Sequence, residues 1–224
     1  MNSQLSDQDT QPVNREDVEG AVASDDQVVL GEHYSIGGRD VYEDRVRTGH
    51  VTTQSGQRLA VALVADGVGG QAQGERAAQI AVDSIFWYLR NGEEAEVPEL
   101  LKRALAYANS KVYQAAEESG VKGMSTTASM AVVVNGERLF VANVGDSAVF
   151  LYRNGKLNKL TRDHTFANVK VWRGEMSAEQ AAQHPKAEVV LRALGLRERV
   201  NVDVGFHVGT EEYQEANKRG KNGL

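Results

Sequence analysis

A carboxylate and a set of glycines follow one apolar run in the chain. Residues 59–65 are all apolar, Asp66 comes next, and glycines occupy positions 67, 69, 70 and 74. The run predicts a strand buried on both faces. A carboxylate at the end of such a strand, on a backbone free to take unusual angles, is a common way to build an ion or phosphate site. The alternative is a plain Asp-Gly turn, an interpretation that the long helical pattern after Gly74 and another acidic motif upstream both weaken.

A second acidic motif lies upstream, at Glu43 and Asp44. It falls in a strand-like run, 42–52, which a turn cluster joins to the run before Asp66. Such a hairpin would place Glu43 and Asp44 beside Asp66. Carboxylates brought this close repel each other unless a cation lies between them. Hard divalent ions meet that need, and they can turn a bound water into a hydroxide nucleophile near neutral pH.

Arg39 opens the same motif, and its guanidinium is suited to bind a phosphate through two parallel hydrogen bonds. Arg39, Asp44 and Asp66 together have the groups needed for metal-assisted hydrolysis of a phosphate ester. On spacing alone, a surface salt bridge between Arg39 and Glu43 accounts for these two charges equally well.

The composition restricts the kinds of site that the chain can form. Its 224 residues suit one large domain or two small ones. There is no cysteine, which excludes disulfides and thiolate metal sites and leaves oxygen ligands or the five histidines. This donor set favours magnesium, manganese or calcium.

Charge is concentrated at the N-terminus. Residues 1–27 hold seven acids and one base, and the remaining 24 acids and 24 bases cancel. No basic face for nucleic acid is indicated. No apolar run approaches the roughly 20 residues that span a bilayer, and no signal-peptide pattern follows Met1. We therefore expect a soluble, cytoplasmic, monomeric protein without nucleic-acid or membrane partners.

Hydrophobic periodicity and turn residues predict two long helices between groups of strands. Helices are expected at 74–91, 98–119, 178–183 and 188–194, and strands at 28–36, 42–52, 59–65, 127–134, 138–144, 148–152, 156–160 and 200–208. Ser177 and Gln180 form a capping-box pattern, and Asn135-Gly136 predicts a type I′ turn. Antiparallel hairpins around a helical layer indicate an α+β layered domain rather than a parallel doubly wound sheet.

The chain divides into three parts by composition. Residues 1–27 are too polar and acidic to bury much apolar surface, so we expect a disordered leader. Residues 28–210 would form the folded domain, with an excursion over the sheet within it. Residues 211–224 are polar, with three acids and three bases, and we expect a tail with no apolar face to bury.

Six short motifs between residues 34 and 195 resemble, in order, those of the metal-dependent (type 2C, PPM) protein serine/threonine phosphatases. They are Arg39–Asp44, Asp66–Gly70 with Gly74-Glu75, Ser125–Thr127, Gly145–Ser147, Leu160–His164 and Leu191–Gly195. The detail is closest to bacterial members, whose flap the segment 173–185 resembles. The resemblance implies an αββα four-layer sandwich, incomplete here at the C-terminus, with a flap at about 164–186.

For a metal centre, the resemblance implies roles for single residues. Asp44 and Asp66 would hold two Mn²⁺ or Mg²⁺ ions, with the carbonyl of Gly67 as a further ligand. Asp146 matches the residue that helps to hold a third, weaker metal in some members.

The resemblance also implies roles around that centre. Glu43 would mainly orient metal-bound water, and Arg39 would bind the substrate phosphate. Asp163-His164 would buttress the flap rather than ligate metal. Val68 occupies a position where some members carry a histidine proposed as general acid, so the resemblance identifies no general acid here.

Two further metal-binding aspartates of the family have no counterpart in this chain. The family carries one in a Ser-Asp-Gly motif and one in an Asp-Asn motif, and neither motif occurs here. We therefore expect a C-terminally truncated phosphatase with impaired activity on phosphoserine and phosphothreonine. The implied partners are a phosphoprotein substrate and a cognate Ser/Thr kinase. The alternative is a non-catalytic pseudophosphatase that binds phosphoproteins or a regulator.

Overall fold

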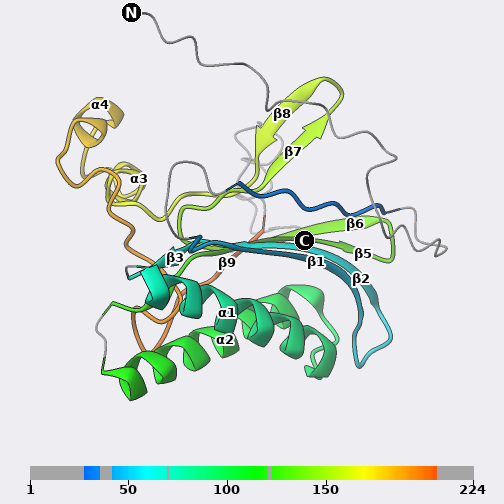
Figure 1. Ribbon diagram of the computed structural model, residues 1–224. Helices are drawn as coiled ribbons and strands as arrows, with labels where there is room; N and C mark the ends of the chain where they lie inside the picture. The colour runs from blue at the N-terminus through cyan, green and yellow to red at the C-terminus, as the bar shows by residue number, and fades with distance from the viewer. Residues whose placement is uncertain (1–27, 36–41, 70, 121–122, 206–224) are drawn as a thin grey trace, which may run out of the picture.

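The computed structural model describes residues 28–35, 42–69, 71–120 and 123–205. The expected leader, 1–27, and tail, 211–224, lie outside these residues. Figure 1 shows a large sheet with two long helices on one face, a β-hairpin above the other face, and two short helices beyond one end. Within the described ranges, no helix is long and apolar enough to cross a membrane.

The large sheet has five antiparallel strands in the order β1-β2-β5-β6-β9. The strands are β1 (Arg45–Thr52), β2 (Arg58–Ala65), β5 (Ala128–Val134), β6 (Arg138–Val144) and β9 (Asp203–Val204). Leu63 of β2 pairs with Met130 of β5, and both are fully buried in the core. Since alternate residues of a strand point to the same face, apolar residues at every second position make one continuous core surface.

Helices α1 (Gln71–Asn91) and α2 (Val97–Ser119) cover that core surface. Each buries an apolar stripe at helical spacing, as Leu101 and Leu105 do in α2. A side chain of this kind contributes about 1.5–3 kcal/mol when it is fully buried. Gly120 ends α2 in the left-handed conformation, with φ of 67°, which favours glycine.

Six smaller elements complete the described fold. They are the paired strands β3 (Gly67–Val68) and β4 (Ser125–Thr126), the hairpin β7 (Phe150–Arg153) and β8 (Lys156–Lys159), and the helices α3 (Phe166–Trp172) and α4 (Ala178–Ala182). The predicted capping box opens α4. The backbone N–H of Gln180 donates to the hydroxyl of Ser177, and that of Ser177 donates to the side-chain oxygen of Gln180.

The α+β assignment is confirmed. The two long helices and the strands of all three predicted hairpins begin and end within three residues of their expected positions. Asn135 and Gly136 have φ of 51° and 74°, which confirms the type I′ turn. Of the four layers expected, the described residues form one helical layer and one large sheet.

The helix expected at 188–194 is wrong. The N–H of Leu191 donates to the carbonyl of His164 at 2.8 Å, and Leu194 exchanges two backbone hydrogen bonds with Thr126. Because these main-chain groups bond to distant segments, they are not available for bonds within a helix. The apolar spacing of this run reflects burial of an extended segment.

Two expected strands are also not observed at their expected length. Residues 28–35 are described and form no strand. Of the run 200–208, only Asp203–Val204 pair with the sheet, and residues from 206 onward lie outside the described part of the chain. Alternating polarity in the run 200–208 indicates a half-buried strand, but a strand also needs a neighbouring strand that pairs with it in the right register.

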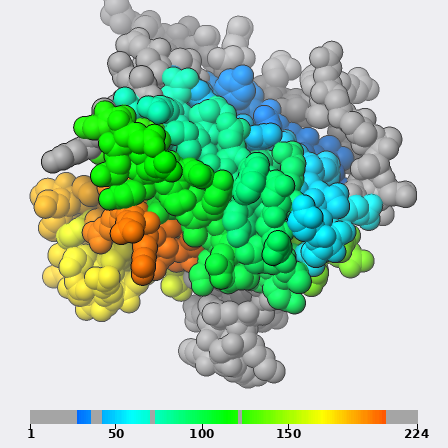
Figure 2. Space-filling view, turned by 90° about the horizontal axis from the view of Figure 1, so that it is seen from below, coloured from blue at the N-terminus to red at the C-terminus, as the bar shows by residue number. Residues whose placement is uncertain are grey.

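A buried amide on α2 fastens the segment that leads to β9. Asn109 is 1% exposed, donates to the carbonyls of Arg197 and Glu198 at 3.1 and 3.0 Å, and accepts from the N–H of Gly195 at 2.9 Å. Figure 2 shows this segment, in orange, packed against α2, in green. One side chain therefore satisfies three backbone groups of the segment.

Asn109→Ala is expected to lower the free energy of unfolding by about 2–3 kcal/mol, because it leaves buried backbone groups without partners. Urea unfolding followed by circular dichroism measures this loss. Asn91→Ala is the matched control, since its exposed amide bonds only the carbonyl of Trp87, and it should change stability by less than about 0.5 kcal/mol. Equal losses in the two variants would contradict the prediction.

Candidate active site

Residues at the end of β4 hold the main chain at Asp66, between β2 and β3. Its carbonyl accepts from the N–H of Thr127 at 2.8 Å and from the hydroxyl of Thr126 at 2.9 Å. Its N–H donates to the hydroxyl of Thr127 at 2.9 Å. Both threonines are buried, whereas Asp66 is partly exposed. The Ser125–Thr127 motif therefore fixes the backbone that presents the carboxylate.

Gly67 lies where three backbone segments meet. A Cβ added to it would lie 2.2 Å from the carbonyl oxygen of Gly74, in the first turns of α1, and 2.7 Å from that of Glu43. Only glycine fits so close an approach of backbone to backbone. The contact brings both the start of α1 and the chain before β1 against the residue that follows Asp66.

Continuing the β1–β2 register by one position sets Asp44 opposite Asp66. The ladder ends with Arg45 opposite Ala65, so the next antiparallel position joins the two aspartates. The close contact at Gly67 lies one position further in the same register. Directly opposed residues point their side chains to one face, with Cβ atoms about 4.5–5.5 Å apart. Continuing the ladder by this one position thus puts Asp44 and Asp66, the two aspartates that the sequence predicts for a metal centre, on one face of the hairpin end.

Arg45 fastens the start of α1 over these strand ends. Its Nη2 lies 2.5 Å from Oε1 of Glu75, and its Nε donates to Oε1 of Gln79 at 3.0 Å. Its Nη1 donates to the carbonyl of Asp44 at 2.8 Å. Sequence reasoning missed Arg45, although a basic residue directly after an acidic pair is a signal that could have found it.

Tyr42 precedes the acidic pair. Burial raises the pKa of its phenol, and the charge of Asp44 raises it further. Its ring contacts that of Tyr34, with centroids 5.4 Å apart. The phenol of Tyr42 therefore stays protonated at neutral pH, so it adds no negative charge beside the carboxylates.

Asp146 lies in a tight turn after β6. Gly145 has φ of 112°, and a Cβ added there would come within 2.6 Å of the side chain of Thr127. The hydroxyl oxygens of Ser147 and Thr127 are 2.6 Å apart. Because the Thr127 hydroxyl also accepts from the N–H of Asp66, one buried side chain links the Asp146 turn to the backbone of Asp66.

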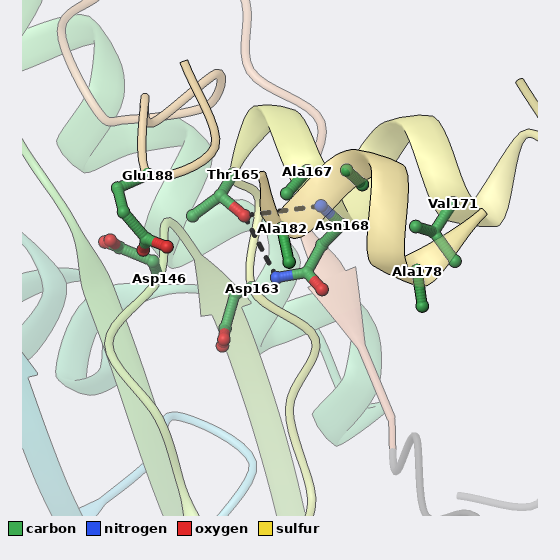
Figure 3. A pocket seen from close by; sticks show the side chains of 10 residues that line it. Asp146, Asp163, Thr165, Ala167, Asn168, Val171, Ala178, Ala182 and Glu188 are labelled. Carbon is green, nitrogen blue, oxygen red and sulfur yellow. Dashed lines mark hydrogen bonds between the residues drawn. The ribbon is translucent and has the colours of Figure 1, made fainter. Parts of the chain in front are cut away.

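A cavity of about 430 Å³ opens between the Asp146 turn and the α3–α4 segment, residues 166–182 (Figure 3). In this view Asp146 and Glu188 lie on one side of it, and side chains of α3 and α4 lie on the other. Asp163 also lines the cavity, but Nζ of Lys159 lies 2.5 and 2.6 Å from its two carboxylate oxygens. The wall opposite Asp146 is formed mainly by small apolar side chains, namely Ala167, Val171, Ala178, Ala181 and Ala182.

Two further predicted site residues are Arg39 and Glu43. Arg39 lies outside the described residues, and Glu43, next to Asp44, is partly exposed. In the part of the chain that the structure describes, no group of three or more histidine, aspartate or glutamate side chains could hold a metal ion. Within the described residues, the candidate site therefore rests on Asp44 and Asp66 alone, and Asp146 belongs to no such group of three.

A family model for protein phosphatase 2C matches residues 37–194, which is more than half of the chain. The chain belongs to the protein phosphatase 2C family. The serine/threonine phosphatase stp of Listeria welshimeri is 36% identical over 150 residues, which cover 64% of this chain and 58% of that protein. The protein phosphatase PhpP of Streptococcus pneumoniae is 26% identical over 159 residues, covering 70% and 63%. The chain thus spans less than two thirds of the length of these curated relatives.

Solved structures of phosphatases share the fold. The serine/threonine phosphatase of S. agalactiae superposes with a TM-score of 0.63 at 28% identity, covering 77% of this chain and 71% of that one. The catalytic domain of the phosphatase PstP in complex with two manganese ions superposes with a TM-score of 0.57 at 28% identity, covering 75% and 67%. These likenesses support a protein phosphatase 2C fold for the described residues.

The metal dependence of the protein phosphatase 2C family agrees with the donors at the paired aspartates. The carboxylates of Asp44 and Asp66 and the carbonyl of Gly67 are all oxygen donors, which hard divalent cations prefer. Mg²⁺ is usually bound through one or two carboxylates and keeps several waters. A two-carboxylate pair at the end of a rigid hairpin therefore fits such an ion.

Proposed function

We propose that the chain is a metal-dependent protein serine/threonine phosphatase that hydrolyses phosphoserine and phosphothreonine in proteins. The observation that carries this proposal is the end of the β1–β2 ladder, where the last pair, Arg45 and Ala65, adjoins Asp44 and Asp66 next to the closely packed Gly67. Two carboxylates on one face of a hairpin end form an electronegative site that favours a divalent cation. Membership of the protein phosphatase 2C family supports the same reaction class.

Each predicted residue then has a role in hydrolysis. Asp44 and Asp66, with the carbonyl of Gly67, would hold two Mn²⁺ or Mg²⁺ ions. When bound, the ions would supply an activated water and offset the charge of the phosphate. Glu43 would accept a hydrogen bond from the attacking water, and Arg39 would donate two parallel hydrogen bonds to the phosphate.

Asp146 has a separate role in the proposal. It would help to hold a further, more weakly bound divalent ion at the cavity that it lines. Asp163 and Glu188 also line that cavity, and the carboxylate of Asp163 is paired with Lys159.

We also propose that the 224 residues alone hydrolyse phosphate esters slowly. The family pattern includes two more metal-binding aspartates, in Ser-Asp-Gly and Asp-Asn motifs, and the sequence contains neither motif. A site with fewer carboxylates binds its ions less firmly and holds the attacking water less well. The same observation favours a second candidate function, a non-catalytic module that binds phosphoproteins or a regulator.

The partners and location follow from the proposed reaction. The substrates would be phosphoproteins, and a serine/threonine kinase that forms them would act in the same compartment, which we propose is the cytoplasm. We expect the chain to act as a monomer, without nucleic acid or membrane.

With Mn²⁺, the chain is expected to release phosphate from a phosphothreonine peptide and from p-nitrophenyl phosphate at less than about 0.01 s⁻¹. This rate is at least about a hundredfold below the lower end of usual enzyme turnover. Asp66→Asn should abolish the remaining turnover. Asp83→Asn, at an aspartate of α1 whose side chain is 58% exposed, is the control and should leave it unchanged. The measurement is phosphate release with the chain in excess over the peptide.

The outcomes separate the candidate functions. Slow turnover that needs both Mn²⁺ and Asp66 supports an impaired phosphatase. Turnover above about 1 s⁻¹ that Asp66→Asn abolishes supports the phosphatase and contradicts the impairment. Phosphopeptide binding without Mn²⁺-dependent turnover supports the binding module and contradicts the phosphatase.

A further inference from the structure

His164 is fully buried and contacts the Asp146 turn at two points. The backbone N–H of Gly145 donates to Nδ1 of His164 at 3.0 Å, and the backbone N–H of His164 donates to the carbonyl of Gly145 at 2.9 Å. Two hydrogen bonds to one residue fix both the place and the rotation of its peptide groups. Asp146 follows Gly145 directly, so the direction of its side chain depends on this contact.

The other ring nitrogen of His164 faces a charged pair. Since Nδ1 accepts a hydrogen bond, the proton of the neutral ring is on Nε2. Nε2 lies 3.2 Å from Oδ2 of Asp203, on β9. Nη1 of Arg192 lies 2.8 Å from Oδ1 of Asp203 and 3.2 Å from Nε2. The edge of the sheet thus sets the tautomer and the orientation of the ring.

His164 also lies at the entry to the α3–α4 segment. The next residue, Thr165, is the N-cap of α3, and its hydroxyl accepts from the backbone N–H of Asn168. The ring of Trp172, at the end of α3, lies edge-on to the imidazole with centroids 6.2 Å apart. One buried side chain therefore joins the sheet edge, the Asp146 turn and α3, which are the elements around the cavity of Figure 3.

We propose that His164 is a positioning residue for Asp146. It holds the Gly145-Asp146 turn so that the carboxylate of Asp146 faces the cavity, and it does so through the bond from the Gly145 N–H to Nδ1. Arg192 and Asp203 act indirectly, because they fix the orientation of the His164 imidazole. This inference rests on the proposed function, in which Asp146 binds the weaker divalent ion.

Two substitutions separate the two ends of the ring. His164→Asn places an amide oxygen near the position of Nδ1 and keeps an acceptor for Gly145. His164→Gln places its amide near the position of Nε2 and keeps only the contact with Asp203. We expect His164→Gln to weaken the weaker class of Mn²⁺ sites by about tenfold or more, as loss of a residue behind a metal ligand commonly does. His164→Asn should stay within about threefold of wild type.

Two measurements follow these variants. Electron paramagnetic resonance of free Mn²⁺ gives the affinity of each class of sites without any turnover. Hydrogen exchange at the Gly145 amide reports the bond to Nδ1 without any metal, and the amide should stay protected in His164→Asn and lose protection in His164→Gln. His50→Asn and His50→Gln, at an exposed histidine of β1, are the matched controls and should change neither quantity.

The possible results decide the inference separately from the proposed function. It is overturned if His164→Gln matches wild type, if His164→Asn is impaired as much as His164→Gln, or if wild type has one class of Mn²⁺ sites only. It is also overturned if Asp146→Asn leaves the weaker class intact. Asp66→Asn tests the proposed function by itself, because that substitution should remove the tighter class.

Discussion

Gly67→Ala is expected to give a chain that neither packs α1 against the backbone after Asp66 nor binds Mn²⁺ tightly. The added methyl would lie 2.2 and 2.3 Å from the carbonyl oxygen and carbon of Gly74, and 2.7 Å from the carbonyl oxygen of Glu43. All three are main-chain atoms, so no side-chain rotation relieves the overlap. Either α1 or the chain before β1 must move, at a cost of about 3 kcal/mol or more. A domain has only about 5–15 kcal/mol of stability in total.

Urea unfolding and Mn²⁺ titration measure the effect of Gly67→Ala. Gly31→Ala is the matched control, because a Cβ at Gly31 meets no atom within 4 Å. That control should change stability by less than about 0.5 kcal/mol. Wild-type unfolding of Gly67→Ala would show that α1 and Gly67 are not in backbone contact.

Asp66→Asn and Asp44→Asn are each expected to weaken the tighter Mn²⁺ binding by about a hundredfold or more, while cooperative unfolding is retained. Loss of a residue behind a metal ligand already costs about 10–100-fold in affinity, and loss of a ligand should cost at least as much as the upper end of that range. The two effects should be similar because the β1–β2 register, continued by one position, sets the two carboxylates opposite each other. The affinity of free Mn²⁺, measured by electron paramagnetic resonance, tests both variants.

The control for the aspartate variants lies on α1. Asp83 pairs with Arg47 at 3.1 Å, and its side chain is 58% exposed. Asp83→Asn removes the same charge from an exposed site, so Mn²⁺ affinity should not change. If Asp44→Asn bound Mn²⁺ as wild type does while Asp66→Asn did not, the ion would not be shared between the opposed carboxylates.

The parts of the fold that local residues determine could be predicted from the sequence. Asn135-Gly136 takes positive φ at both residues, so it specifies the turn between β5 and β6 by itself. Ser177 and Gln180 satisfy each other's backbone groups within one helical turn. The β1–β2 hairpin follows from two strand-like runs and a short turn, and its register, continued by one position, sets Asp44 opposite Asp66.

The parts that depend on distant partners could not be predicted in this way. The run 188–194 has helical spacing, but its backbone bonds to His164 and Thr126, which are far away in the sequence. The site residues Arg192 and Asp203 became apparent only in the structure, because their role comes from meeting at the His164 ring. Arg192 lies inside a motif of otherwise apolar residues, which is the one sequence signal that marked it.

The most direct test of the central claim, a metal centre shared by Asp44 and Asp66, is the position of Mn²⁺ on the folded chain. Amide resonances of the ¹⁵N-labelled protein are recorded with a small, substoichiometric amount of Mn²⁺, which broadens the signals of nuclei near the ion. The account predicts that the amides of Asp44, Asp66 and Gly67 broaden first, and that they stay sharp in Asp66→Asn. Sharp signals from these three residues in wild type, with broadening elsewhere or nowhere, would contradict it.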